Sequence, residues 1–280
     1  MVGVHNAALS WQQAAVLTVV LALAAAVVSV APQTRATLLA AFAREATLIS
    51  GLYALWQLAG TLSVLGTRGA YARGDWLERT ERAWHLPSEV SVQRAFLGDS
   101  ITIQAANLYY ATMHFGVLFV FLIWLFVWHR DRYAKVRRVL ALTTLACLLI
   151  QLIPVAPPRL LPGYGYIDTA AQYNQSVYSL GFGADSLSAM PSVHVAWAVL
   201  VAWACARIGR GPWRWLGAVH AVVTVLVVVV TANHFWADGI VAVAVLATCA
   251  VLEAALGRAA AALWQRVKQP QQLAEAGAWS

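Results

Sequence analysis

The chain has 280 residues, of which 61% are hydrophobic and only 11% are charged, and its mean hydropathy is +0.66. A soluble domain of average composition carries roughly 25% charged residues, so this composition excludes an ordinary soluble protein and indicates that lipid surrounds much of the chain. The net charge of +7 does not predict nucleic-acid binding, because the basic residues gather at the ends of apolar segments, where anionic lipid accounts for them.

Apolar segments of about 20 residues, the length that crosses about 30 Å of hydrocarbon, occur seven times along the chain. They are 12–31, 46–66, 108–128, 139–156, 189–206, 215–232 and 236–256. The second is the weakest, since Gln57 and three glycines dilute it, and a buried or interfacial helix is the alternative. We therefore expect an all-α, polytopic membrane protein with six or seven transmembrane helices.

The segments divide the chain into four parts. Residues 1–66 form an N-terminal transmembrane region, and residues 108–256 hold a core bundle of five spans. Between them, residues 67–107 place tryptophans among charges, which is typical of helices lying in the extracytoplasmic membrane interface; a plain extracytoplasmic loop is the alternative. Residues 257–280 form a tail.

Loop charge predicts the orientation, because Lys and Arg collect on the cytoplasmic side. The basic residues that predict cytoplasmic loops are Arg130, Arg132, Lys135, Arg137 and Arg138 in one connection, Arg207, Arg210 and Arg214 in a second, and Arg258, Arg266 and Lys268 in the tail. By contrast, the 157–188 loop holds one basic residue, Arg159, and is expected outside. We expect an integral protein of a bacterial plasma membrane with its C-terminus in the cytoplasm.

This orientation brings three short segments to the extracytoplasmic side: 156–162 (APPRLLP), 190–197 (MPSVHVAW) and 231–238 (TANHFWAD). Arg159 offers a permanent, bidentate clamp for phosphate oxygens. Ser192 marks a helix N-terminus, which is suited to an anion, and His194 in the first turn is placed to act as a general acid. His234 and Asp238 are one helical turn apart, so the carboxylate orients one ring nitrogen and leaves the other to attack phosphorus.

Three further residues are candidates for substrate binding. His114 and Tyr110 lie at a similar depth in the third span, and Tyr166 follows Arg159 in the same loop. A buried histidine bonded to a neighbouring helix is an equally good explanation for His114, and a loop of this composition needs no function. No string such as HExxH occurs, so we expect neither a metal nor another cofactor.

The three strings resemble the membrane branch of the phosphatidic acid phosphatase type 2 superfamily, and more closely its inositol-phosphorylceramide-synthase-like subgroup. The resemblance covers roughly residues 108–256. It implies that His234 is the nucleophile that forms a phosphohistidine, that His194 is the proton donor and that Asp238 is the orienter. Leu152 and Val228 stand where the superfamily has a Lys and an Arg, and Val193 replaces the Gly of its PSGH motif.

These observations predict a metal-independent phosphatase or phosphotransferase that acts on a lipid or polyprenyl phosphate at the outer leaflet. A non-enzymatic membrane bundle, either a transporter or a haem-binding protein using His114, His194 and His234, is the alternative. The sequence leaves open the headgroup, the acceptor and the oligomeric state.

Overall fold

The computed structural model describes residues 10–30, 34–63, 69–176 and 187–277. Within these ranges the backbone is helical and carries one isolated bridge, between Val155 and Ser188, in place of strands. The predicted all-α fold is confirmed.

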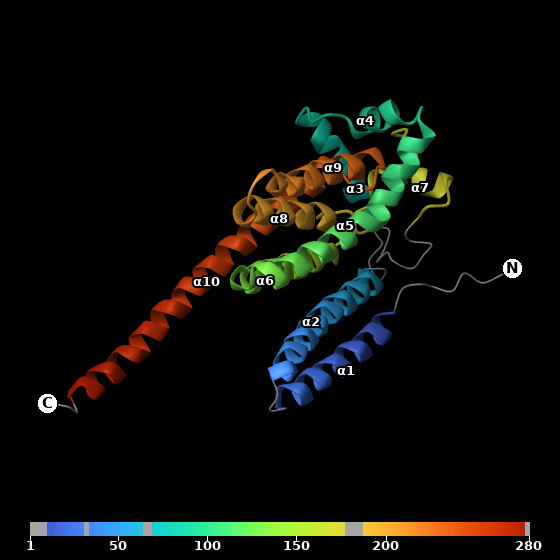
Figure 1. The fold of residues 1–280 in the computed structure, drawn as a ribbon. Helices are drawn as coiled ribbons and strands as arrows, with labels where there is room; N and C mark the ends of the chain where they lie inside the picture. Colours follow the sequence, from blue (N-terminus) through green and yellow to red (C-terminus); the bar gives the residue numbers. More distant parts are fainter. Residues whose placement is uncertain (1–9, 31–33, 64–68, 177–186, 278–280) are drawn as a thin grey trace.

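The N-terminal region is a hairpin of two helices, α1 (Trp11–Val30) and α2 (Thr34–Ser63). Figure 1 shows α2 running beside α6, the helix formed by Arg130–Gln151. The helix α2 begins before the predicted span at residue 46, because Glu45 in its first half is paired with Arg137 and accepts a hydrogen bond from Tyr133, both on α6. This acid is therefore tolerated within a helix that is otherwise largely apolar.

The segment after the hairpin forms two short helices, α3 (Ala70–Ala83) and α4 (Glu89–Phe96). Ser88 caps α4, with its side chain accepting a hydrogen bond from Ser91, and Asp99 caps the next helix in the same way. Helices were expected here, and their position at the membrane interface stays a prediction.

Five helices form the core: α5 (Ser100–Trp128), α6, α8 (Val193–Ile208), α9 (Leu216–Val230) and α10 (Trp236–Gly277). Buried aliphatic and aromatic side chains from α5, α6, α8 and α10 pack together in its centre, among them Leu125, Val139, Leu200 and Leu246. The expected span 139–156 is too long, because α6 ends at Gln151. Pro154, Pro157 and Pro158 follow, and proline cannot continue a helix.

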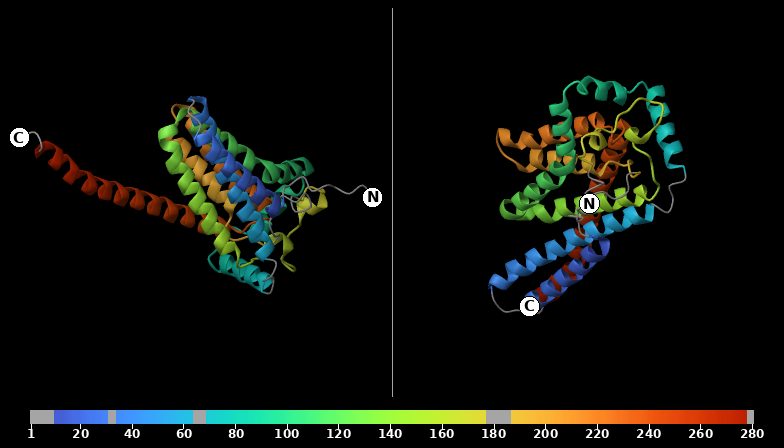
Figure 2. Two further views of the ribbon diagram at one scale, coloured as in Figure 1. Left: turned by 90° about the horizontal axis from the view of Figure 1, so that it is seen from below. Right: turned by 90° about the vertical axis from the view of Figure 1, so that its right-hand side faces the viewer.

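Short elements connect the core helices at its two ends. The turn η2 (Pro158–Leu160) and the helix α7 (Thr169–Gln172) lie between α6 and α8, and η3 (Pro212–Trp215) joins α8 to α9. Figure 2 shows the far part of α10 extending away from the bundle, on the side opposite to α3, α4 and α7. The site described below therefore lies at the end of the bundle remote from the C-terminus.

Among the described residues, four helical segments are long and apolar enough to cross a membrane. They are Trp11–Ser29, Ser100–Trp128, Pro212–Val230 and Trp236–Ala262. The helix α8 is apolar but shorter, with 16 residues. The chain is thus an integral membrane protein, and the expected total of six or seven spans stays a prediction.

Candidate active site

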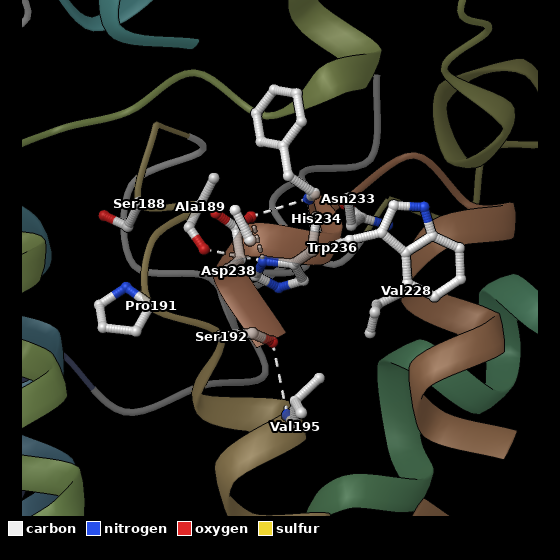
Figure 3. Close-up of polar contacts among 12 residues, drawn as sticks. Ser188, Ala189, Pro191, Ser192, Val195, Val228, Asn233, His234, Trp236 and Asp238 are labelled. Atoms are coloured by element: carbon white, nitrogen blue, oxygen red, sulfur yellow. Dashed lines mark hydrogen bonds and ion pairs between the residues drawn. The ribbon is translucent and has the colours of Figure 1, made fainter. Parts of the chain in front are cut away.

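His234 and Asp238 form a hydrogen-bonded pair at the start of α10, as their spacing predicts. The Nδ1 atom of His234 lies 3.2 Å from Oδ2 of Asp238 and 2.8 Å from the carbonyl oxygen of Ala189 (Figure 3). Because a carbonyl oxygen can only accept, Nδ1 carries the proton and donates it. The lone pair of the imidazole is therefore on Nε2, the atom that would attack phosphorus.

The environment of His234 keeps its ring neutral. Its side chain is buried, and burial lowers the pKa of His234 to about 4. Its Nε2 atom is also buried and has no hydrogen-bond partner among the described residues. A neutral ring with an unused, unprotonated nitrogen is the state that a histidine nucleophile requires.

Ser192 and His194 open α8, which faces the same pair. The Ser192 side chain accepts a hydrogen bond from the backbone N–H of Val195 at 3.4 Å, as an N-cap does. Its own backbone N–H donates to the carbonyl oxygen of Asp238 at 3.1 Å, so the start of α8 is tied to the start of α10. The ring centroids of His194 and His234 are 5.6 Å apart, which is close enough for one phosphoryl group to contact both.

Arg159 lies directly beside the turn that carries His234. Its Nε donates to Oδ1 of Asn233 and its Nη1 donates to Oδ2 of Asp168, both at 2.9 Å. Its backbone N–H donates to Ala232 at 2.9 Å. The Arg159 side chain is only 4% exposed, so its planar guanidinium is fixed in direction by Asn233 and Asp168 rather than extended into solvent.

His114 and Tyr110 of α5 belong to the same cluster. The His114 ring packs edge-on against His194 with centroids 4.2 Å apart, and the Tyr110 ring lies 4.6 Å from His194 and 6.4 Å from His234. Tyr166 is placed differently, since its hydroxyl donates to Glu78 of α3 at 2.6 Å. The structure thus brings seven of the eight candidate residues to the start of α8 and α10 and directs Tyr166 toward α3.

Two buried carboxyl groups at the site were not anticipated. Glu81 accepts a hydrogen bond from the backbone N–H of Ala237 at 2.6 Å, and Glu89 accepts one from that of Trp236 at 3.3 Å. Both side chains are about 3% exposed, so α3 and α4 hold the first turn of α10. Burial, and then the neighbouring Glu89, raises the pKa of Glu81 to about 9. In the sequence these acids belong to a segment in which acidic and basic residues balance. Their burial is explained only by their hydrogen bonds to the start of α10, which is distant in the sequence.

Over the described ranges, no group of three or more His, Cys, Asp or Glu side chains is arranged to hold a metal ion.

The fold and the site together define a helical membrane protein with a His–Asp pair, a second histidine and an arginine gathered at one end of its bundle. The family model of the PAP2 superfamily, the phosphatidic acid phosphatase type 2 proteins, matches residues 75–252, and the chain belongs to this superfamily. Membership points to phosphatase or phosphotransferase activity. Neither the curated proteins nor the solved structures gave a match.

Proposed function

We propose that the protein cleaves the phosphate ester of a membrane lipid or polyprenyl phosphate through a phosphohistidine on His234. The observation that carries this proposal is the hydrogen bonding of His234, whose Nδ1 is held by Ala189 and Asp238 while its buried Nε2 is left without a described partner. That arrangement fixes both the tautomer and the direction of the ring before substrate binds.

The steps follow from the positions of the side chains. Nε2 of His234 attacks phosphorus, and the bond from phosphorus to the lipid oxygen breaks. His194, in its protonated form, gives its proton to that departing oxygen. Asp238 and the Ala189 carbonyl stabilise the positive ring that forms, and Arg159 pairs with the phosphoryl oxygens.

The second half of the reaction returns His234 to its starting state. His194, now neutral, takes a proton from the incoming water or alcohol as that oxygen attacks phosphorus, and the bond from phosphorus to Nε2 breaks. Water gives free phosphate and an alcohol gives a new phosphodiester. The APP string at 156–158 favours assignment to the inositol-phosphorylceramide-synthase-like subgroup, and therefore transfer to an alcohol.

Two positions that hold cationic residues in the superfamily hold Leu152 and Val228 here. In this proposal Arg159 therefore contributes more of the phosphate binding. Leu152, which replaces the Lys, is 42% exposed on the surface of the bundle, and Val228, which replaces the late Arg, is buried at 2%. The carbonyl oxygen of Val228 instead accepts hydrogen bonds from the backbone of Asn233 and His234. This position therefore shapes the turn that carries the nucleophile and supplies no charge.

Purified protein in detergent, incubated with phospholipids and polyprenyl phosphates with and without inositol or another alcohol, tests the proposal. Mass spectrometry separates free phosphate from a new phosphodiester, and a base-stable, acid-labile phosphoprotein marks the covalent step. His234→Ala should abolish turnover and labelling while leaving the folded protein intact. A His234→Ala variant that retains substantial turnover would refute the covalent mechanism.

We place this chemistry at the outer leaflet. The proposal is supported by the charges at the start of α6, where the structure has helix in place of the loop expected at 129–138. Its first turns hold Arg130, Arg132, Lys135, Arg137 and Arg138, whereas Arg159 follows the other end of that helix.

A further inference from the structure

A large apolar cavity separates the N-terminal hairpin from the core helices and reaches the histidine cluster. Its volume is about 800 Å³. The helices α1, α2, α5 and α6 form its walls, and His194, His234 and Asn233 lie at one end. His234 thus lines a space whose walls are almost entirely hydrocarbon.

The cavity is long as well as apolar. Its lining on α5 recurs every three or four residues from Tyr110 to Val127, a helical distance of about 26 Å at about 1.5 Å per residue. On α6 the lining extends from Gln151 back to Tyr133, about 27 Å by the same measure. One leaflet contributes about 15 Å of hydrocarbon, half of the roughly 30 Å core. A chain that filled this space would pass the bilayer midplane.

A polar contact between the hairpin and α6 borders the far part of the cavity. Glu45 of α2 accepts a hydrogen bond from the Tyr133 hydroxyl at 2.8 Å and is paired with Arg137, both on α6. Glu45 and Tyr133 also line the cavity. The space therefore has the polar groups of the histidine cluster at one end and a polar contact between two of its walls near the other.

We propose that the hairpin α1–α2 completes a binding site for the hydrocarbon chain of the substrate and thereby selects lipid phosphates by chain length, favouring a single chain that passes the midplane. The site rests on the proposed function, because its occupant is the chain attached to the phosphate that His234 attacks. The hairpin lies before the residues matched by the family model, 75–252, so one wall of this site belongs to a part of the chain that the superfamily match does not include.

The selection must be steric. A lipid chain is already in an apolar solvent within the bilayer, so its transfer into an apolar cavity gains little hydrophobic free energy. What the cavity adds is a fixed length and width, and a bulky side chain part-way along it should exclude long chains and spare short ones.

Matched tryptophan variants test this on both walls. Ile123 on α5 and Ile49 on α2 line the cavity, while Val120 on α5 and Leu55 on α2 are exposed and lie outside its lining. Ile123 is 12 residues beyond Ala111 along α5, about 18 Å deeper. Ile123→Trp and Ile49→Trp are therefore deep plugs, and Val120→Trp and Leu55→Trp are their controls.

The substrates are a long polyprenyl phosphate, a two-tailed phosphatidate and a short-chain alkyl phosphate. We expect the plugs to lower kcat/KM for the polyprenyl phosphate at least about tenfold while turnover of the short-chain phosphate stays within about twofold of the parent protein. The controls should change neither. Equal losses on all substrates, unchanged long-chain turnover, or a parent protein that prefers the two-tailed lipid would each overturn the proposal.

A second measurement does not depend on turnover. A long-chain alkyl phosphonate with a photoreactive group near its end should label peptides of α2 and α5 in the parent protein, and the deep plugs should suppress that labelling. If the parent protein turned over no phosphate ester but was still labelled in this way, the proposed function would fail and the chain site would stand. Labelling confined to other helices would overturn the chain site alone.

Discussion

The replacement of Asp238 by Asn separates the two contributions that a carboxylate can make to a histidine nucleophile. In a catalytic triad the same change costs about 10⁴ in kcat, because the histidine adopts the wrong tautomer. Here the carbonyl oxygen of Ala189 lies 2.8 Å from Nδ1 of His234, closer than Oδ2 of Asp238 at 3.2 Å. Since that carbonyl can only accept, it keeps the proton on Nδ1 in the variant.

Asp238→Asn should therefore lose only the charge that stabilises the ring after attack. A hydrogen bond to a charged group contributes about 1.5–3 kcal/mol, which predicts a rate loss of about 10- to 150-fold. The amide oxygen of Asn can still accept from Phe235, whose N–H now donates to Oδ2 at 2.9 Å, so the turn should survive. Single-turnover formation of the phosphoprotein measures the step directly. A loss near 10⁴ would show that Ala189 does not hold the tautomer, and a rate near that of the parent would show that the carboxylate does not assist attack.

Three other outcomes are expected. The pKa of Glu81 is raised from 4.5 to about 9, so between these values the folded state keeps a proton that the unfolded state releases. The free energy of unfolding should therefore fall as the pH rises from 4.5 to about 9. Unfolding midpoints of Glu81→Gln measured over the same pH range should lose this dependence, and an unchanged slope would contradict the prediction. Asp168→Asn should loosen Arg159 and raise KM more than it lowers kcat in steady-state assays, whereas an effect confined to kcat would argue against phosphate binding. A cysteine at the exposed Gln172 should react with an impermeant thiol reagent in intact cells and one at the exposed Asp131 only after lysis; the opposite pattern would move the site to the cytoplasmic leaflet.

The sequence predicts that the candidate residues meet at one end of the bundle, because two simple physical rules apply to it. Apolar length gives the spans and basic residues give the orientation, and together they place Arg159, His194 and His234 at one end of the bundle. The contact between His234 and Asp238 also follows from their spacing of four residues, although His234 lies in the turn just before α10 and only Asp238 lies on the helix. Neither rule needs the details of packing.

The remaining features depend on tertiary contacts that leave no local signal. The acceptor at Ala189 is a backbone carbonyl, which any residue provides, so no side chain marks it. Glu81 and Glu89 accept hydrogen bonds from backbone N–H groups at the start of α10, about 150 residues away in the sequence. Their spacing in the sequence is the same as that of charged residues on any exposed helix. Tyr166 shares a loop with Arg159, yet its hydroxyl binds Glu78, because nearness in sequence does not fix the direction of a side chain in a loop rich in Gly and Pro.

The distribution of these contacts explains which groups remain to bind phosphate. Three successive amides where α10 begins donate to carboxyl groups: Phe235 donates to Asp238, Trp236 to Glu89 and Ala237 to Glu81. These donors at the N-terminus of α10 are therefore already satisfied by the protein's own side chains. The start of α8 differs, since its cap is the uncharged hydroxyl of Ser192, and His194 stands in its first turn. In the proposed mechanism, Leu152 and Val228 stand in place of two cations, so the attraction for a phosphate is assigned to Arg159 and the α8 N-terminus. Under this proposal, the start of α10 fixes the turn that carries His234, while the α8 N-terminus and Arg159 bind the anion.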